Sequence, residues 1–85
     1  MGVLWEDRGW ADYLFWQTVD KKTVKRINTL IKDAQRNPYE GIGKPEPLKG
    51  NLSGFWSRRI NEEDRLVYDY SEGRIRIISC KGHYE

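Results

Sequence analysis

The 85-residue chain has one cysteine, one histidine and no long apolar run, and each shortage excludes a class of protein. A single cysteine cannot form an intramolecular disulfide, so a reducing cytoplasm is the expected setting. No segment approaches the roughly 20 apolar residues of a membrane span, and the first residues lack the basic and apolar regions of a signal peptide. One cysteine and one histidine cannot build a closed zinc site, so no metal or other cofactor is expected.

Aromatic and charged residues, in contrast, are abundant. Aromatics make up 13% of the chain, with four Trp and five Tyr, which is too many rings for a disordered protein. Fifteen Lys and Arg face 13 Asp and Glu, so the net charge of +2 says little about partners and the clustering of charge must be considered instead. The length leaves room for one domain, residues 1–85.

Two helices are predicted in the first half of the chain. In residues 7–18 the bulky side chains share one helical face by their spacing: Trp10, Tyr13, Leu14 and Phe15. Asp20 is a plausible N-cap for a second helix, and Asn37-Pro38 ends it, because proline disfavours helical geometry in the residue before it. The apolar stripe of this second helix consists of Val24, Ile27, Leu30, Ile31 and Ala34.

Strand patterns dominate the rest. Residues 3–5 read as a first strand, and a loop over residues 38–51 holds all three prolines. Three further strands are expected over residues 52–60, 65–71 and 74–81, joined by turns at 61–64 and 71–73. The fold class predicted is therefore α+β, with two N-terminal helices packed on a twisted, mostly antiparallel β-sheet.

Cations and rings interleave in the strand region. The cations are Lys44, Lys49, Arg58, Arg59, Arg65, Arg74, Arg76 and Lys81, and the rings are Phe55, Trp56, Tyr68, Tyr70 and Tyr84. Cations that contact phosphates and rings that stack on bases are the combination that binds single-stranded RNA. Rings in a core beneath a solvated arginine face would give the same composition, and composition alone favours that second interpretation.

Strand alternation and three isolated residues add detail. One face of residues 52–60 carries Trp56 with Arg58, and the other carries Ser57 with Arg59, so a sheet could gather several arginines on a polar face. Glu46 lies between two prolines that limit its backbone, although it could equally be an ordinary loop residue. Likewise, His83 could be incidental, and Cys80 is more simply a buried small residue than a nucleophile paired with His83.

Several blocks of sequence resemble one known family. The segments Lys44-Pro-Glu-Pro-Leu-Lys49, Asn51-Leu-Ser-Gly-Phe-Trp-Ser-Arg-Arg-Ile60, Arg65-Leu-Val-Tyr68 and His83-Tyr84 are similar to the YoeB (Txe) family of RelE-type toxins. The segment from Trp10 to Leu14, with Trp16, resembles that family's first helix. The resemblance covers nearly the whole chain and implies a RelE-like fold.

The resemblance also implies a function. A bacterial member of this family is a ribosome-dependent endoribonuclease that cuts messenger RNA in the decoding site and is neutralised by a YefM-type antitoxin. By matching motif, Glu46 resembles the general base, His83 the general acid and Arg65 the phosphate-stabilising arginine. Positions that bind or orient RNA are matched by Lys44, Lys49, Arg59 and Tyr84.

Some features leave alternatives open. Glu85 follows Tyr84, where a family member is expected to end, and its carboxylate bears on the role of Tyr84. A homodimer, a ribosome-independent ribonuclease and a non-catalytic RNA- or partner-binding module on the same fold are all compatible with the sequence. Cleavage of naked RNA, or of RNA on ribosomes, would discriminate among these activities.

Overall fold

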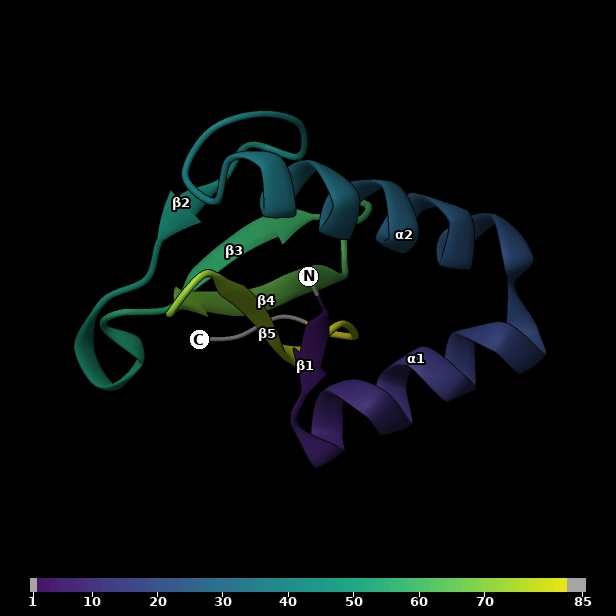
Figure 1. Cartoon of the computed structure of the whole chain (residues 1–85). Coiled ribbons are helices and arrows are strands. Elements are labelled where there is room, and N and C mark those ends of the chain that lie inside the picture. Colours follow the sequence, from purple (N-terminus) through teal and green to yellow (C-terminus); the bar gives the residue numbers. More distant parts are fainter. Residues whose placement is uncertain (1, 83–85) are drawn as a thin grey trace.

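The computed structural model describes residues 2–82 and contains one five-stranded sheet with two α-helices (Figure 1). In chain order the elements are β1 (Val3–Trp5), α1 (Asp7–Val19), α2 (Lys21–Arg36), β2 (Glu46–Pro47), a 3-10 turn (Gly50–Leu52), β3 (Trp56–Arg59), β4 (Arg65–Ser71) and β5 (Arg74–Ser79). The strand order is β1-β5-β4-β3-β2, with β1 parallel to β5 and the other neighbours antiparallel. The predicted α+β class and the mostly antiparallel sheet are confirmed.

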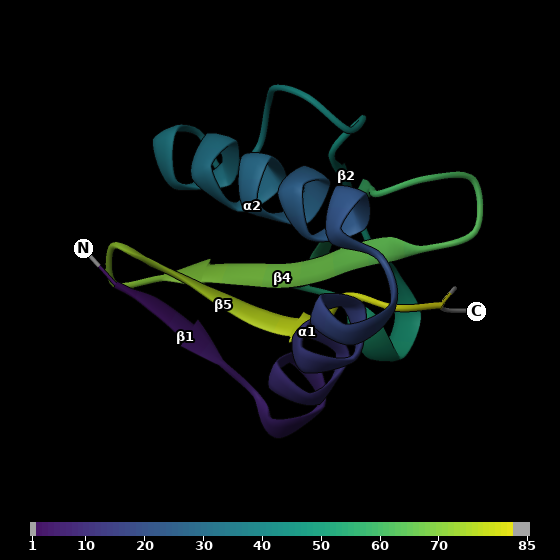
Figure 2. The ribbon, with the colours of Figure 1, turned by 90° about the vertical axis from the view of Figure 1, so that its right-hand side faces the viewer.

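Helix α2 forms as the sequence predicts. The Asp20 carboxylate caps it by accepting hydrogen bonds from the backbone N–H of Lys22 at 3.1 Å and of Thr23 at 3.3 Å. The pKa of Asp20 is lowered mainly by a hydrogen bond from the Thr23 hydroxyl, and the two backbone bonds lower it further. The helix lies along one face of the sheet (Figure 2), and four residues of its apolar stripe, Ile27, Leu30, Ile31 and Ala34, form the core with Leu66, Tyr68, Ile75 and Ile77.

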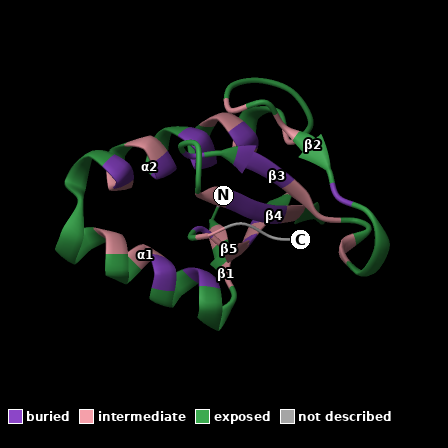
Figure 3. Ribbon diagram, turned by 180° about the vertical axis from the view of Figure 1, so that it is seen from behind, coloured by how far each residue is buried: buried purple, intermediate pink, exposed green. Residues whose placement is uncertain are grey.

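Helix α1 forms where predicted, and its predicted face packs only in part. Tyr13 packs against the core, as does Trp16, whereas Trp10, Leu14 and Phe15 are exposed. Gly9 and Asp12 are buried, and Figure 3 shows α1 as largely exposed with short buried parts. The burial of Gly9 reflects a close backbone approach, since a Cβ atom on Gly9 would lie 2.7 Å from the carbonyl oxygen of Ile77. A bulky residue cannot occupy that position, so the packed side of α1 combines small and polar residues with two aromatic rings.

The strands differ from the prediction mainly at their ends. The strand predicted over residues 52–60 is shorter, because Leu52 belongs to the 3-10 turn and Gly54 adopts a φ of +99°. Strand β4 has the predicted bounds, and β5 ends at Ser79 rather than at Lys81. The predicted loop contains the two-residue strand β2, which the sequence did not indicate.

Alternation along the strands separates two faces of the sheet. Arg58, Leu66, Tyr68, Ile75 and Ile77 belong to the buried core on the side of α2. The opposite side, which we call the arginine face, carries Arg59, Arg65 and Arg76 together with Glu46, Ser57 and Val67. Cross-strand partners share a face, as do alternate residues of one strand, and Arg76 is paired with Asp69, two residues after Val67. Within residues 2–82, neither helix is long and apolar enough to cross a membrane.

Candidate active site

The arginine face is assembled from strands that are distant in sequence. Glu46 of β2 lies opposite Ser57 of β3, and Ser57 lies opposite Val67 of β4. Arg59 and Arg65 face each other on the same two strands. Because directly paired residues share a face of a sheet, three of the predicted site residues, Glu46, Arg59 and Arg65, lie on one surface.

Glu46 is exposed and lies on the edge strand β2. Its neighbours Pro45 and Pro47 fix two φ angles, and its pairing with Ser57 holds the short strand against β3. Ser57 itself is buried beneath this edge. The carboxylate is thus presented from a restrained backbone, as the two prolines suggested.

Arg65 is partly exposed at the start of β4 and is held by the turn before it. Its Nη1 donates hydrogen bonds to the carbonyl oxygens of Asn61 at 2.8 Å and of Asp64 at 3.2 Å. A guanidinium has five N–H donors, so this arrangement orients the group by one nitrogen, and as far as residues 2–82 are concerned it leaves other donors for an anion. Arg59, opposite it, is exposed.

Lys44 and Lys49 flank this surface in the loops around β2, and both are exposed. The backbone of Lys44 adopts a φ of 53°, and the preceding carbonyl of Gly43 accepts a hydrogen bond from the N–H of Arg59 at 2.7 Å. The two lysines therefore add positive charge beside Glu46. The remaining site residues, His83 and Tyr84, lie outside the described residues, as does Glu85.

A groove of about 520 Å³ lies between the arginine face and the start of α1. Phe55, Val67 and Ile78 give it an apolar lining, while Arg8, Arg76, Glu6 and Asp7 contribute charge.

The guanidinium of Arg76 binds the Asp69 carboxylate at 2.6 Å and Glu6 at 3.3 Å. This pairing raises the pKa of Arg76, mainly through the hydrogen bonds that its guanidinium donates to the Asp69 carboxylate. Glu6 and Asp7 were not predicted as site residues, because nothing in the local sequence connects them to the strands that form the groove.

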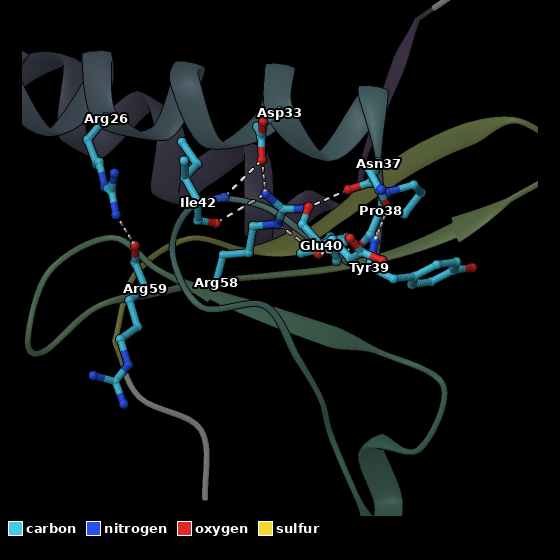
Figure 4. A network of polar contacts seen from close by, with 10 residues as sticks. Arg26, Asp33, Asn37, Pro38, Tyr39, Glu40, Ile42, Arg58 and Arg59 are labelled. Carbon is cyan, nitrogen blue, oxygen red and sulfur yellow. Dashed lines mark hydrogen bonds and ion pairs between the residues drawn. The ribbon is translucent and has the colours of Figure 1, made fainter.

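Arg58 is the main correction among the predicted surface cations. Its side chain is fully buried on the α2 side of the sheet, so it cannot contribute to an exposed basic face (Figure 4). Nη1 donates to the Asp33 carboxylate at 2.6 Å and to the Ile42 carbonyl, Nη2 donates to the carbonyls of Asn37 and Glu40, and Nε donates to the Tyr68 hydroxyl. All five N–H groups are used, so Arg58 fastens the loop after α2 to the sheet.

The same network sets the ionisation of its partners. The hydrogen bond from the Arg58 guanidinium holds the pKa of Asp33 below its ordinary value. Burial raises the pKa of Tyr68, whose hydroxyl donates to the Pro38 carbonyl at 2.6 Å. Tyr68 is therefore a core residue and not a base-stacking ring.

The other predicted rings divide between the two sides of the sheet. Trp56 and Tyr70 gather with Tyr39 on the α2 side, where the Tyr39 ring centroid is 5.0 Å from that of Trp56 and 6.3 Å from that of Tyr70. Phe55 is the predicted ring that lines the groove on the arginine face. Cys80 is buried as expected, and burial raises its pKa to about 12.

Known proteins resemble this chain in sequence and in fold. A sequence-family model, that of the YoeB-like toxins of bacterial type II toxin–antitoxin systems, matches residues 5–84. Toxin YoeB of Escherichia coli strain K12 is 58% identical over 84 residues, which cover 99% of this chain and all of that protein. The solved heterotetrameric YoeB–YefM toxin–antitoxin complex and the YoeB dimer, both from Staphylococcus aureus, each superpose with a TM-score of 0.92 at 50% identity, covering 99% of this chain and 98% of theirs.

Proposed function

This chain belongs to the YoeB-like toxins of bacterial type II toxin–antitoxin systems, and from that membership we propose that it is a ribosome-dependent endoribonuclease that cuts messenger RNA. The observation that carries the proposal is the common position of Glu46, Arg59 and Arg65 on the arginine face. A carboxylate beside two guanidinium groups matches what phosphodiester cleavage by a neighbouring hydroxyl requires.

The proposed reaction begins at the ribose. Glu46 accepts the proton of the 2′-hydroxyl as this oxygen attacks the adjacent phosphorus. The bond from phosphorus to the 5′-oxygen breaks, and His83, as an imidazolium, protonates that leaving oxygen. The products are a 2′,3′-cyclic phosphate and a 5′-hydroxyl, and the scheme uses no metal or other cofactor.

Cations stabilise the charge that develops on the phosphoryl oxygens. Arg65 is the principal donor, with the carbonyls of Asn61 and Asp64 orienting its guanidinium in advance. Arg59, Lys44 and Lys49 contribute positive charge around it, and Tyr84 orients the substrate. A preorganised donor contributes on the order of 10²–10³-fold, and positioned acid–base groups about 10²–10⁴-fold.

The ribosome supplies what this small surface lacks. In-line attack needs the 2′-oxygen, phosphorus and 5′-oxygen aligned, and holding reactants in that geometry removes much of the barrier. Messenger RNA in the decoding site is held by the ribosome, so the toxin need only add its chemical groups. A cytoplasmic location follows from this substrate and stays a prediction.

A YefM-type antitoxin is the proposed inhibitor, as in the complex of the S. aureus relative. An acidic segment of the antitoxin would cover the arginine face and displace His83 and Tyr84. Exposed Trp10, Leu14 and Phe15 on α1 offer apolar area for the antitoxin or for a homodimer of the kind that relative forms. Copurification with the adjacent antitoxin gene product and loss of toxicity on co-expression would support this assignment, and unchanged toxicity without a complex would contradict it.

Cleavage assays test the proposed reaction. The protein is incubated with naked RNA and with programmed ribosomes, and the new RNA ends are mapped. We expect cutting on ribosomes with 2′,3′-cyclic phosphate ends, and no cutting when the scissile 2′-hydroxyl is replaced by 2′-O-methyl or hydrogen. Chelators should not affect the chemical step, provided that the magnesium the ribosome needs is retained.

Variants separate chemistry from binding. Glu46→Gln, Arg65→Ala and His83→Gln should lose mainly the single-turnover rate on ribosomes. Arg74→Ala is the matched control, because Arg74 is an exposed arginine paired with Ser71 at the far end of β4. Cleavage of the 2′-O-methyl substrate, or wild-type rates with Glu46→Gln and His83→Gln combined, would leave the non-catalytic binding module as the better description.

A further inference from the structure

The segment that follows β5 belongs to no strand, yet its backbone is held at every described residue. Five hydrogen bonds from distant parts of the chain reach Cys80, Lys81 and Gly82. We propose that these contacts, which we call the tail clamp, position His83 for the cleavage step, and that Asp64 is the principal positioning residue. The inference rests on the function proposed above and assigns roles to residues that do not contact RNA.

Helix α1 supplies one half of the tail clamp. The Asp12 carboxylate accepts a hydrogen bond from the N–H of Cys80 at 3.0 Å, and Nε1 of Trp16 donates to the Cys80 carbonyl at 2.8 Å. Nη2 of Arg8 donates to the Lys81 carbonyl at 3.2 Å and Nε pairs with Asp12. Positions 8, 12 and 16 share one helix face by their spacing. This role explains why α1 buries a carboxylate, Asp12, on the side that faces β5.

The turn before β4 supplies the other half. Oδ1 of Asp64 accepts from the N–H of Gly82 at 2.7 Å, and the N–H of Arg65 donates to the Gly82 carbonyl at 3.1 Å. Both peptide groups of the residue before His83 are therefore fixed. Gly82 adopts a φ of +85°, which side-chain-bearing residues rarely adopt, so the chain takes a defined direction at this point.

The same turn orients the proposed phosphate-binding group. The Asp64 carbonyl accepts from Nη1 of Arg65, while the Asp64 side chain holds Gly82. One residue thus connects the arginine that meets the phosphate with the segment that leads to the proposed general acid. The Asp64 carboxylate holds the residue before His83, so its loss should act chiefly on leaving-group protonation. Small misplacements of reacting groups reduce rates by about 10²-fold.

A substrate with a sulfur atom in place of the scissile 5′-oxygen isolates that step, because a thiolate leaves without protonation. Single-turnover cleavage on ribosomes is compared for the oxygen and the sulfur substrate. We expect Asp64→Ala and His83→Gln each to slow cleavage of the oxygen substrate by about 10–100-fold and to cut the sulfur substrate at nearly the wild-type rate. Glu46→Gln should remain slow on both, because the attacking hydroxyl is unchanged.

Glu62→Ala is the matched control. It removes an exposed carboxylate from the same turn and leaves in place the bond from Gly82 to Asp64 and the carbonyls that orient Arg65. Its rates should stay near wild type on both substrates. Asp64→Asn keeps an acceptor for Gly82 and should restore most of the activity that Asp64→Ala loses. If Asp64→Ala does not fold, Trp16→Phe removes one clamp bond while keeping a ring, and its smaller defect should likewise vanish on the sulfur substrate.

The outcomes distinguish the tail-clamp proposal from the proposed general-acid role of His83. If sulfur restores His83→Gln but neither Asp64→Ala nor Trp16→Phe, the tail clamp has no positioning role and the general-acid assignment stands. If sulfur does not restore His83→Gln, the general-acid role fails and the clamp proposal fails with it. Equal defects in Glu62→Ala and Asp64→Ala would also overturn the proposal, since removal of any carboxylate from this turn would then explain the loss.

Discussion

Replacing the buried Arg58 by lysine tests the most connected side chain of the protein. Arg58 is fully buried and donates all five of its N–H groups, at distances from 2.6 Å to 3.1 Å. A lysine ammonium keeps the charge but has three donors, so at least two of the acceptors lose their partner. The substitution therefore changes hydrogen bonding while leaving the ion pair with Asp33 available.

The magnitude follows from the acceptors that are left unpaired. A hydrogen bond from a charged donor contributes about 1–3 kcal/mol in such a part-buried site, so the loss of two in Arg58→Lys should lower the free energy of unfolding by about 2–6 kcal/mol. Domains of this size have a total stability of about 5–15 kcal/mol. Even the lower figure of about 2 kcal/mol lowers Tm by about 8–16 °C in a chain of this length.

Urea denaturation followed by tryptophan fluorescence measures the difference, at one fixed protein concentration because association stabilises the folded state. Arg59→Lys is the control, since Arg59 is the next residue along β3 and is exposed. It should change the free energy of unfolding by less than about 0.5 kcal/mol. If Arg58→Lys were no more costly than Arg59→Lys, the five hydrogen bonds of Arg58 would not stabilise the fold.

Three further predictions concern packing and ionisation. Because Arg58 lowers the pKa of Asp33 below 3.8, the unfolded state binds that proton more readily, so the stabilisation is present above about pH 4 and is lost at lower pH. Urea titrations should show a steeper fall in stability below pH 4 for the wild type than for Asp33→Asn, and parallel curves would contradict the pairing. The buried thiol of Cys80, whose pKa is raised to about 12, should resist a thiol reagent at pH 8 until urea unfolds the protein, and rapid native labelling would be the contrary result. Gly9→Ala should cost about 1–3 kcal/mol, because its Cβ atom would meet the Ile77 carbonyl at 2.7 Å, whereas Gly2→Ala, with no atom within 4 Å, should be neutral in thermal unfolding.

Where local pattern and tertiary environment agree, the sequence was sufficient. The stripe of α2 and the cap at Asp20 were predicted because an amphipathic helix and its N-cap depend on residues a few positions apart. The bounds of β4 and the turn at Glu72-Gly73, where both φ angles are positive, were predicted for the same reason. The family resemblance named Glu46, Arg59 and Arg65, and strand alternation put Arg59 on the polar side of β3.

Where a residue's environment comes from distant parts of the chain, the sequence was insufficient. Arg58 looks like its exposed neighbour Arg59, and only the loop after α2 supplies the acceptors that allow its burial. The exposed Trp10 and the buried Asp12 depart from the expected face of α1. Cys80, 68 residues away from Asp12, provides the partner that a buried carboxylate needs. Composition and periodicity thus determined the fold class and the elements, whereas the long-range hydrogen bonds decided which charges are buried and which remain on the surface.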